Sequence, residues 1–211
     1  NGMFQVCSMG QASVDQAGSF VVNVPFPCQG NTSRKHAFTT HTCANNLLLW
    51  QLFAEEYVLS NGILPDLGRF QHRIVLLPKR FHSVMSDCAF DALSTQGRWS
   101  YATSPANDWG FGYIWMCGDC WNWGPTFFHE IGHNYGCQHA RSETGPFLGD
   151  TSDITDAMGA WGGDRIRCHN APHLWGMGWA APLGIVRDTE LSAGMAPRIL
   201  TIPVQWSGPT G

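Results

Sequence analysis

The stretch that decides the fold spans residues 129–139 and reads HEIGHNYGCQH, which follows the pattern H-E-x-x-H-x-x-G-x-x-H. Residues four apart on an α-helix lie on one face, so His129 and His133 can present two imidazole nitrogens to a single ion. Glu130 lies beside them on the same helical turn. The spacing therefore predicts a helix that carries two metal ligands and an adjacent carboxylate.

The second half of this stretch predicts a third ligand. Gly136 can adopt a positive φ, which a residue with a Cβ resists, so the chain can turn and bring His139 to the metal from outside the helix. Three neutral imidazoles leave one tetrahedral position open, which is typical of a catalytic zinc site rather than a structural one. We therefore predict Zn2+ as the cofactor and Glu130 as the general base that takes a proton from the attacking water.

Two other interpretations of the motif are weaker. Three histidines could lie on an ordinary helix without binding a metal, but the five fixed positions would coincide by chance only about once in 20,000 chains of this composition. The zinc site could instead be purely structural. In that case Glu130 and the open fourth position would have no purpose.

A methionine follows the motif at a suitable distance. Residues 156–159 read DAMG and predict a tight turn that contains Met158. Its thioether would form a soft apolar floor under the three imidazoles without binding the zinc. The chain has seven methionines, so Met158 could also be an ordinary core residue. The order of motif and turn favours the first interpretation.

The motif, its third histidine and Met158 together resemble the metzincin clan of zinc peptidases. Further segments are similar to the gametolysin-type metallopeptidases of volvocine green algae, and the resemblance spans most of residues 9–204. These segments are residues 9–13 (MGQAS), Pro27-Cys28, 72–78 (HRIVLLP), 129–140 (HEIGHNYGCQHA) and 173–179 (HLWGMGW). The resemblance implies a secreted zinc-dependent endopeptidase that acts on proline- and hydroxyproline-rich glycoproteins of the extracellular matrix or cell wall.

The resemblance also implies an α+β fold of the metzincin type, with residues 1–211 forming a single metallopeptidase catalytic domain. Its N-terminal lobe, about residues 1–136, would hold a twisted, mostly parallel sheet and two long helices, the second of which carries the motif. A smaller C-terminal lobe, about residues 137–204, would contain the Met turn and a helix, and residues 205–211 would begin a truncated continuation. An extended peptide would bind in the cleft, by strand addition to an edge near residues 109–116.

The chain also departs from relatives of this clan. Ala160, two residues past Met158, stands where astacin-like relatives carry a tyrosine. The role of that tyrosine, as an extra ligand or oxyanion donor, is therefore vacant or filled from elsewhere. No segment resembles the cysteine switch of the matrixins.

Local patterns predict the individual elements. β-Branched and aromatic residues favour strands at 19–24, 73–77 and 111–116, and the start of another at 199–204. Residues 44–59 predict a helix, and residues 172–175 a short one. The succession of strand, helix and strand up to residue 77 favours a right-handed βαβ crossover and a partly parallel sheet.

Cysteine usage points to an oxidising compartment. The even number of cysteines and their scatter over the whole chain favour structural disulfides, with the connectivity left open. C-x-x-C at Cys117 and Cys120 could also be half of a zinc knuckle or a redox motif, but no second pair completes a knuckle. Asn31-Thr32-Ser33 is an acceptor sequence for N-glycosylation, which fits secretion. The eight cysteines are Cys7, Cys28, Cys43, Cys88, Cys117, Cys120, Cys137 and Cys168.

Charge and hydropathy narrow the range of partners. The formal net charge is −4, without basic clusters, which gives no electrostatic reason to expect a nucleic acid. No stretch reaches the roughly 18 apolar residues of a membrane span. A protein or glycoprotein substrate is the expected partner, and the oligomeric state stays open.

Weaker candidates remain. Asp150, Asp153 and Asp156 could bind a structural Ca2+, but no calcium loop is complete, and a solvated loop is favoured. His169 and His173 could line the cleft, although a surface or supporting position is favoured. The alternative function is a catalytically silent metzincin-like module of an extracellular assembly, against which the intact ligand set and Glu130 argue.

Overall fold

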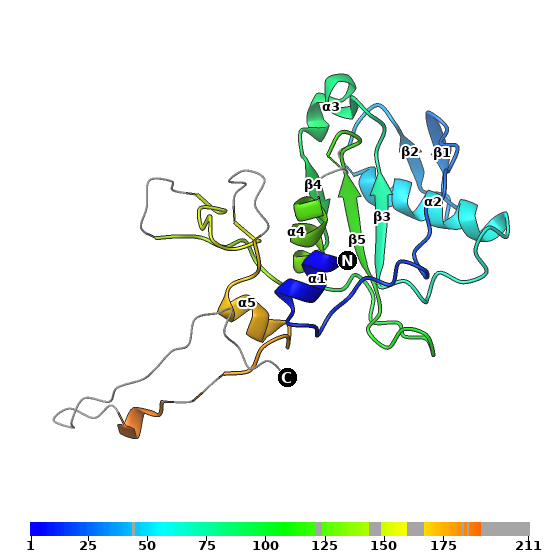
Figure 1. Ribbon diagram of the computed structural model, residues 1–211. Helices are drawn as coiled ribbons and strands as arrows, with labels where there is room; N and C mark the ends of the chain where they lie inside the picture. Colours follow the sequence, from blue (N-terminus) through cyan, green and yellow to red (C-terminus); the bar gives the residue numbers. More distant parts are fainter. Residues whose placement is uncertain are drawn as a thin grey trace. The chain divides into compact units, whose positions relative to one another are not determined.

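The central element in the computed structural model of this chain is a three-stranded sheet in the order β3-β5-β4 (Figure 1). β3 (His72–Leu76) pairs in parallel with β5 (Gly112–Met116), and β4 (Ala92–Ser94) pairs antiparallel with the other side of β5. The sheet is therefore mixed rather than mostly parallel. Because β5 is the middle strand, our assignment of residues 109–116 to the substrate-binding edge is wrong, and the antiparallel edge strand is β4.

The structure describes residues 1–43, 45–120, 124–143, 149–159, 167–182, 184 and 186–190. The chain forms two units, Asn1–Ala180 and Ala181–Gly211. The second unit contributes the short 3-10 helix η2 (Asp188–Glu190). All other elements belong to the first unit and hold the site. Among the described residues, no helix is long and apolar enough to cross a membrane.

All five residues of β5 are buried because helices cover both faces of the sheet. Ile114 packs with Phe128 of α4 (Gly124–Asn134) on one face. On the other face, Trp115 donates a hydrogen bond from Nε1 to the carbonyl oxygen of Leu47, 2.9 Å away, at the start of α2 (Leu47–Ser60). This alternation along the strand explains the continuous apolar run in its sequence.

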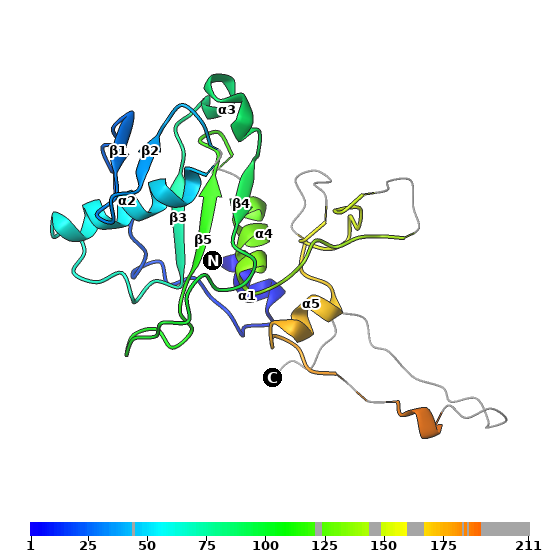
Figure 2. The ribbon, with the colours of Figure 1, turned by 180° about the vertical axis from the view of Figure 1, so that it is seen from behind.

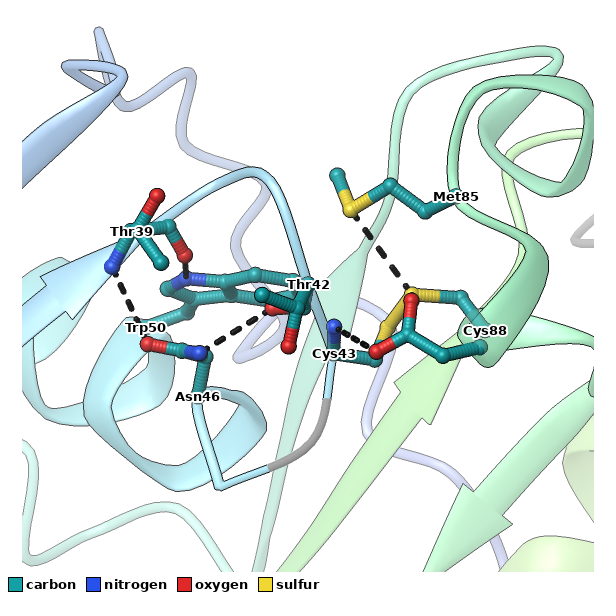
Figure 3. Close-up of a disulfide and its surroundings, with 8 residues drawn as sticks. Thr39, Thr42, Cys43, Asn46, Trp50, Met85 and Cys88 are labelled. Atoms are coloured by element: carbon teal, nitrogen blue, oxygen red, sulfur yellow. Dashed lines mark hydrogen bonds between the residues drawn. A yellow bond between two sulfur atoms is a disulfide. The ribbon is translucent and has the colours of Figure 1, made fainter.

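The start of α2 is fixed by a disulfide and a set of hydrogen bonds, which Figure 3 shows. The predicted helix is confirmed, although it begins at Leu47 rather than residue 44. The Asn46 side chain accepts from the backbone N–H of Thr39 at 3.0 Å, and Trp50 donates from Nε1 to the Thr39 carbonyl at 3.0 Å. Thr39 ends β2 (Ala37–Thr39), which pairs antiparallel with β1 (Gln29–Asn31). The disulfide Cys43–Cys88 ties this corner to η1 (Ser86–Cys88), which follows α3 (Phe81–Val84).

A hydrophobic core lies between the sheet and the three helices α1, α4 and α5. α1 (Gly2–Cys7) and α5 (Ala171–Gly176) lie close together in both views, although they are far apart in sequence (Figures 1 and 2). The disulfide Cys7–Cys168 joins their neighbourhoods. The buried residues of this core are Phe4, Cys7, Ile114, Phe128, Ile131, Leu174 and Trp179. This core supports the face of α4 that packs against the sheet.

The other predicted elements agree with the structure in part. Residues 73–77, 111–116 and 172–175 fall on β3, β5 and α5, as expected. The strand predicted at 19–24 is wrong: this segment is irregular, and Val21 is 90% exposed. β-Propensity reflects packing on a half-buried surface, which this segment lacks. The predicted βαβ crossover therefore does not form, and the parallel pair is β3 with β5 instead. The strand predicted at 199–204 lies outside the described residues.

Six of the eight cysteines form disulfides. The pairs are Cys7–Cys168, Cys43–Cys88 and Cys117–Cys120. Cys28 and Cys137 are free, the first exposed and the second buried. The prediction of structural disulfides is therefore confirmed, although two of the eight cysteines stay unpaired. The zinc-knuckle alternative for Cys117 and Cys120 is excluded by their bond.

A half-buried ion pair joins α2 to β3. Nη1 of Arg73 lies 3.0 Å from Oε2 of Glu55, and the two side chains are only 11% and 16% exposed. The guanidinium also lies 3.5 Å from the ring centroid of Phe111. Because each charge is held away from water, each depends on the other for its stability.

We expect Arg73→Met to lower the free energy of unfolding by about 2 kcal/mol, because Glu55 is left half-buried without its charged partner. The double variant Arg73→Met/Glu55→Gln should recover part of this loss. Urea denaturation followed by tryptophan fluorescence measures both. Arg34→Met, at an exposed position, is the matched control and should change the free energy by less than about 0.5 kcal/mol. An unchanged midpoint for Arg73→Met would contradict the role of the pair.

Candidate metal centre

The helix α4 presents the first part of the motif as predicted. His129 and Glu130 are buried and His133 is half-buried, all on a helix that packs on one face of the sheet. The helix packs against β4 and β5. Gly132 matters for this packing, because a Cβ there would lie 2.6 Å from Sδ of Met158. The glycine therefore lets the methionine approach the helix between the two histidines.

The helix ends in a turn that delivers the third histidine. Gly136 has a φ of +93°, as predicted. Its N–H donates to the carbonyl of His133 at 2.8 Å, and the N–H of Cys137 donates to the carbonyl of Gly132 at 3.0 Å. These two bonds form a Schellman motif, which ends a helix and reverses the chain. His139 then lies beside the helix rather than on it.

The three imidazoles converge. The ring centroid of His133 lies 4.8 Å from those of His129 and His139, and the centroids of His129 and His139 are 5.3 Å apart. One ring nitrogen of each lies within 4.8 Å of those of the other two. The structure therefore brings the three predicted ligands together, at a separation that a single ion can bridge.

The Nδ1 atom of each ring forms a hydrogen bond with an oxygen of the protein. His129 Nδ1 lies 2.8 Å from the carbonyl oxygen of Ala157, and His133 Nδ1 lies 2.8 Å from that of Cys137. His139 Nδ1 bonds Oδ2 of Asp150. When Nδ1 donates to such an oxygen, the lone pair of Nε2 is free to bind a metal. The donor set therefore fits a zinc ion bound by three Nε2 atoms.

Burial keeps the helical histidines neutral. It lowers the pKa of His129 to about 4, and it also lowers the pKa of His133. Hydrogen bonds to backbone carbonyls oppose these shifts without reversing them. Neutral imidazole is the form that binds metals, so no proton has to be displaced from these rings at neutral pH.

Glu130 is held beside the histidines by a residue that the sequence analysis did not identify. The hydroxyl of Ser94 donates to Oε2 of Glu130 at 2.6 Å. Burial raises the pKa of Glu130 to about 6, and the bond from Ser94 works in the opposite direction. A carboxylate with a pKa near neutrality can both accept and return a proton.

A pocket of about 310 Å³ opens over these side chains. One wall is the edge strand β4 with its flanking residues, and α4 forms another. His139, Thr151 and Gly159 complete the lining. The pocket therefore places the exposed edge of the sheet next to Glu130 and the three histidines.

Met158 is fully buried and packs with Cys137 and Ala140 in a small core next to the motif. The Ala140 N–H donates to the Met158 carbonyl at 3.0 Å. Met158 Sδ approaches α4 at Gly132, between the two helical ligands. Ala160 lies outside the described residues, so the vacant tyrosine position has no structural account.

The three aspartates that could bind calcium each contact a different set of residues. Asp150 contacts His139, and Asp153 accepts from the backbone and hydroxyl of Thr155. Asp156 is fully buried and accepts from the backbone N–H groups of Met158 and Asn170. Each of the three carboxylates therefore has hydrogen-bond partners within the protein.

The remaining predicted residues lie away from the pocket. His169 is fully buried, and His173 is half-buried and lies 3.0 Å from Asp156 through Nδ1. Neither lines the described pocket, which fits the supporting position that the sequence favours. Asn31, the predicted glycosylation site, is exposed at the end of β1.

The sequence of this chain was compared with known families and proteins. The model of the family described as gametolysin peptidase M11 matches residues 1–208. A stretch of 60 residues is 40% identical to autolysin of Chlamydomonas reinhardtii and covers 28% of this chain and 9% of that protein. The match thus spans less than a tenth of the relative's length. No solved structure matches the chain. Because the family match covers nearly the whole sequence, the resemblance is confirmed, and the chain belongs to the gametolysin peptidase M11 family.

Proposed function

We propose that residues 1–211 are the catalytic domain of a secreted zinc-dependent endopeptidase of the metzincin type. The observation that carries this proposal is the convergence of three imidazoles, each with Nε2 left free, beside a buried carboxylate at the floor of a pocket. Family membership supports a metallopeptidase. Three disulfides support an oxidising compartment.

The residues of the chain divide the chemistry between them. His129, His133 and His139 would hold the zinc, and the bound ion would supply a Lewis acid that acidifies water and polarises the scissile carbonyl. Glu130 would accept the proton of the attacking water and return it to the departing amide nitrogen. Ser94 would hold Oε2 in place, so that Oε1 faces the substrate. Met158 would serve as the apolar floor of the Met turn.

The edge strand β4 supports binding of an extended peptide. Among the described residues it pairs with β5 along one side only, and it lines the pocket next to Glu130. Backbone groups on the other side of such a strand can hydrogen bond a substrate by strand addition. Proline- and hydroxyproline-rich glycoproteins of the extracellular matrix or cell wall are the substrate class that the family resemblance supports.

The central test is Glu130→Gln, which keeps the shape of the side chain but removes the base. We expect zinc content and unfolding midpoint to stay unchanged while kcat/KM for a proline-rich peptide falls by about 10³-fold. Glu143→Gln, at an exposed position, is the matched control and should retain full activity. Near wild-type cleavage by a zinc-loaded Glu130→Gln protein would refute the assignment. A zinc-loaded wild-type protein without peptidase activity would instead favour a silent module.

Ser94 offers a second test of how Glu130 is oriented. We expect Ser94→Ala to lower kcat by about 10-fold at unchanged zinc content, because one charge-assisted hydrogen bond to the base is lost. Ser94→Thr keeps the hydroxyl and should retain most of the activity. If the alanine and threonine variants lose activity equally, the effect comes from altered packing of β4 rather than from the hydrogen bond.

Asp150 tests the support of the third ligand. We expect Asp150→Asn to weaken zinc affinity by about 10-fold, because a weaker acceptor then faces His139 Nδ1. Competition with a chromophoric chelator measures the dissociation constant. Asp153→Asn is the matched control, since Asp153 contacts Thr155 and not a histidine. Equal affinities of the two variants would show that Asp150 does not support the ligand.

A further inference from the structure

A second group of ligating side chains lies outside the pocket of the candidate metal centre. Cys137 follows the end of α4, His169 precedes α5, and His173 lies on α5. One ligand atom of each residue lies within 4.8 Å of the ligand atoms of the other two. The three residues do not line the pocket around Glu130. They therefore form a separate cluster.

His169 is the member whose position needs an explanation. Its ring is fully buried, and neither Nδ1 nor Nε2 has a hydrogen-bond partner among the described residues. Oδ1 of Asp156 lies 3.7 Å from Nδ1, which is too far for a hydrogen bond. Buried polar atoms without partners are rare in folded proteins, and a bound ion is one of the ways in which they are satisfied.

Cys137 supplies the second element of the cluster. It is 5% exposed and forms no disulfide, although the other buried cysteines, Cys7, Cys43, Cys88 and Cys117, all do. Its backbone carbonyl supports His133, but its thiol takes no part in that contact. A buried cysteine beside two histidines is a combination that soft, nitrogen- and sulfur-binding ions prefer.

Asp156 orients the third member. Its carboxylate is fully buried, and Oδ2 lies 3.0 Å from Nδ1 of His173. The backbone N–H groups of Met158 and Asn170 fix this carboxylate in turn. A carboxylate on Nδ1 is the usual support of a histidine that binds a metal through Nε2.

We propose that Cys137, His169 and His173 form a second metal site, which takes Zn2+. One thiolate and two imidazoles are ligands of the kind that Zn2+ takes in proteins. On binding, the thiol would release its proton to solvent as the sulfur–metal bond forms. The ion would tie the end of α4 to α5.

Cobalt substitution tests the site on the intact chain. A thiolate bound to Co2+ gives a charge-transfer band in the near ultraviolet, whereas a site with three histidines and no thiolate does not. We expect two equivalents of Co2+ per wild-type chain and the thiolate band. Cys137→Ser should lose one equivalent and the band, while Cys28→Ser, which removes the exposed free thiol, should keep both.

His133→Ala separates this site from the proposed catalytic one. This variant should bind one equivalent of Co2+ fewer than the wild type and lose the peptidase activity, but it should retain the thiolate band. Binding of one equivalent without the band by the wild-type chain would overturn the second site and leave the catalytic proposal standing. A band that survives Cys137→Ser would also overturn it. The wild-type spectrum alone shows whether the thiolate band is present. The test therefore does not depend on whether the variants fold.

Discussion

The turn at Gly136 is the constraint on which the candidate metal centre depends. Its positive φ allows two backbone hydrogen bonds that end α4 and reverse the chain. The reversal brings His139 next to the helix, and it also aims the carbonyl of Cys137 at Nδ1 of His133. One short piece of backbone therefore positions two of the three imidazoles. His129 relies on a more distant segment, through the carbonyl of Ala157, and His139 is further supported by Asp150.

The site could be predicted from the sequence because most of its geometry is local. The helical spacing of His129 and His133, and the glycine before His139, are readable within eleven residues. The contacts of Ser94 with Glu130 and of Asp150 with His139 could not be predicted in this way. Ser94 reaches Glu130 from 36 residues away, across a strand pairing that no local pattern reveals. Serine and aspartate are common surface residues, and only the folded sheet and loop show which of them face the histidines.

The fold was predictable to a similar extent. The strand β5 was recognised because burial of all its residues leaves a continuous apolar run in the sequence. The helix α2 was recognised from its long apolar segment, although most of its residues are only half-buried. The order of the strands was not, since sequence patterns do not show which strand lies at an edge. The segment at 19–24 has the residues of a strand, but it pairs with no strand of the described part of the chain, and most of its residues are exposed. The pairing of cysteines likewise depends on spatial neighbours, which is why Cys28 and Cys137 could not be recognised as free.

The disulfide Cys7–Cys168 has a consequence for when the three histidines of the candidate metal centre come together. It joins residues 161 apart, whereas Cys117–Cys120 joins residues three apart. By chain-entropy arguments the long closure stabilises the fold by about 5 kcal/mol and the short one by about 2 kcal/mol. The carbonyl of Cys168 accepts from the N–H of Ala157, whose own carbonyl holds His129. A newly made chain that has not met an oxidant would lack this closure, so its ligands would assemble late.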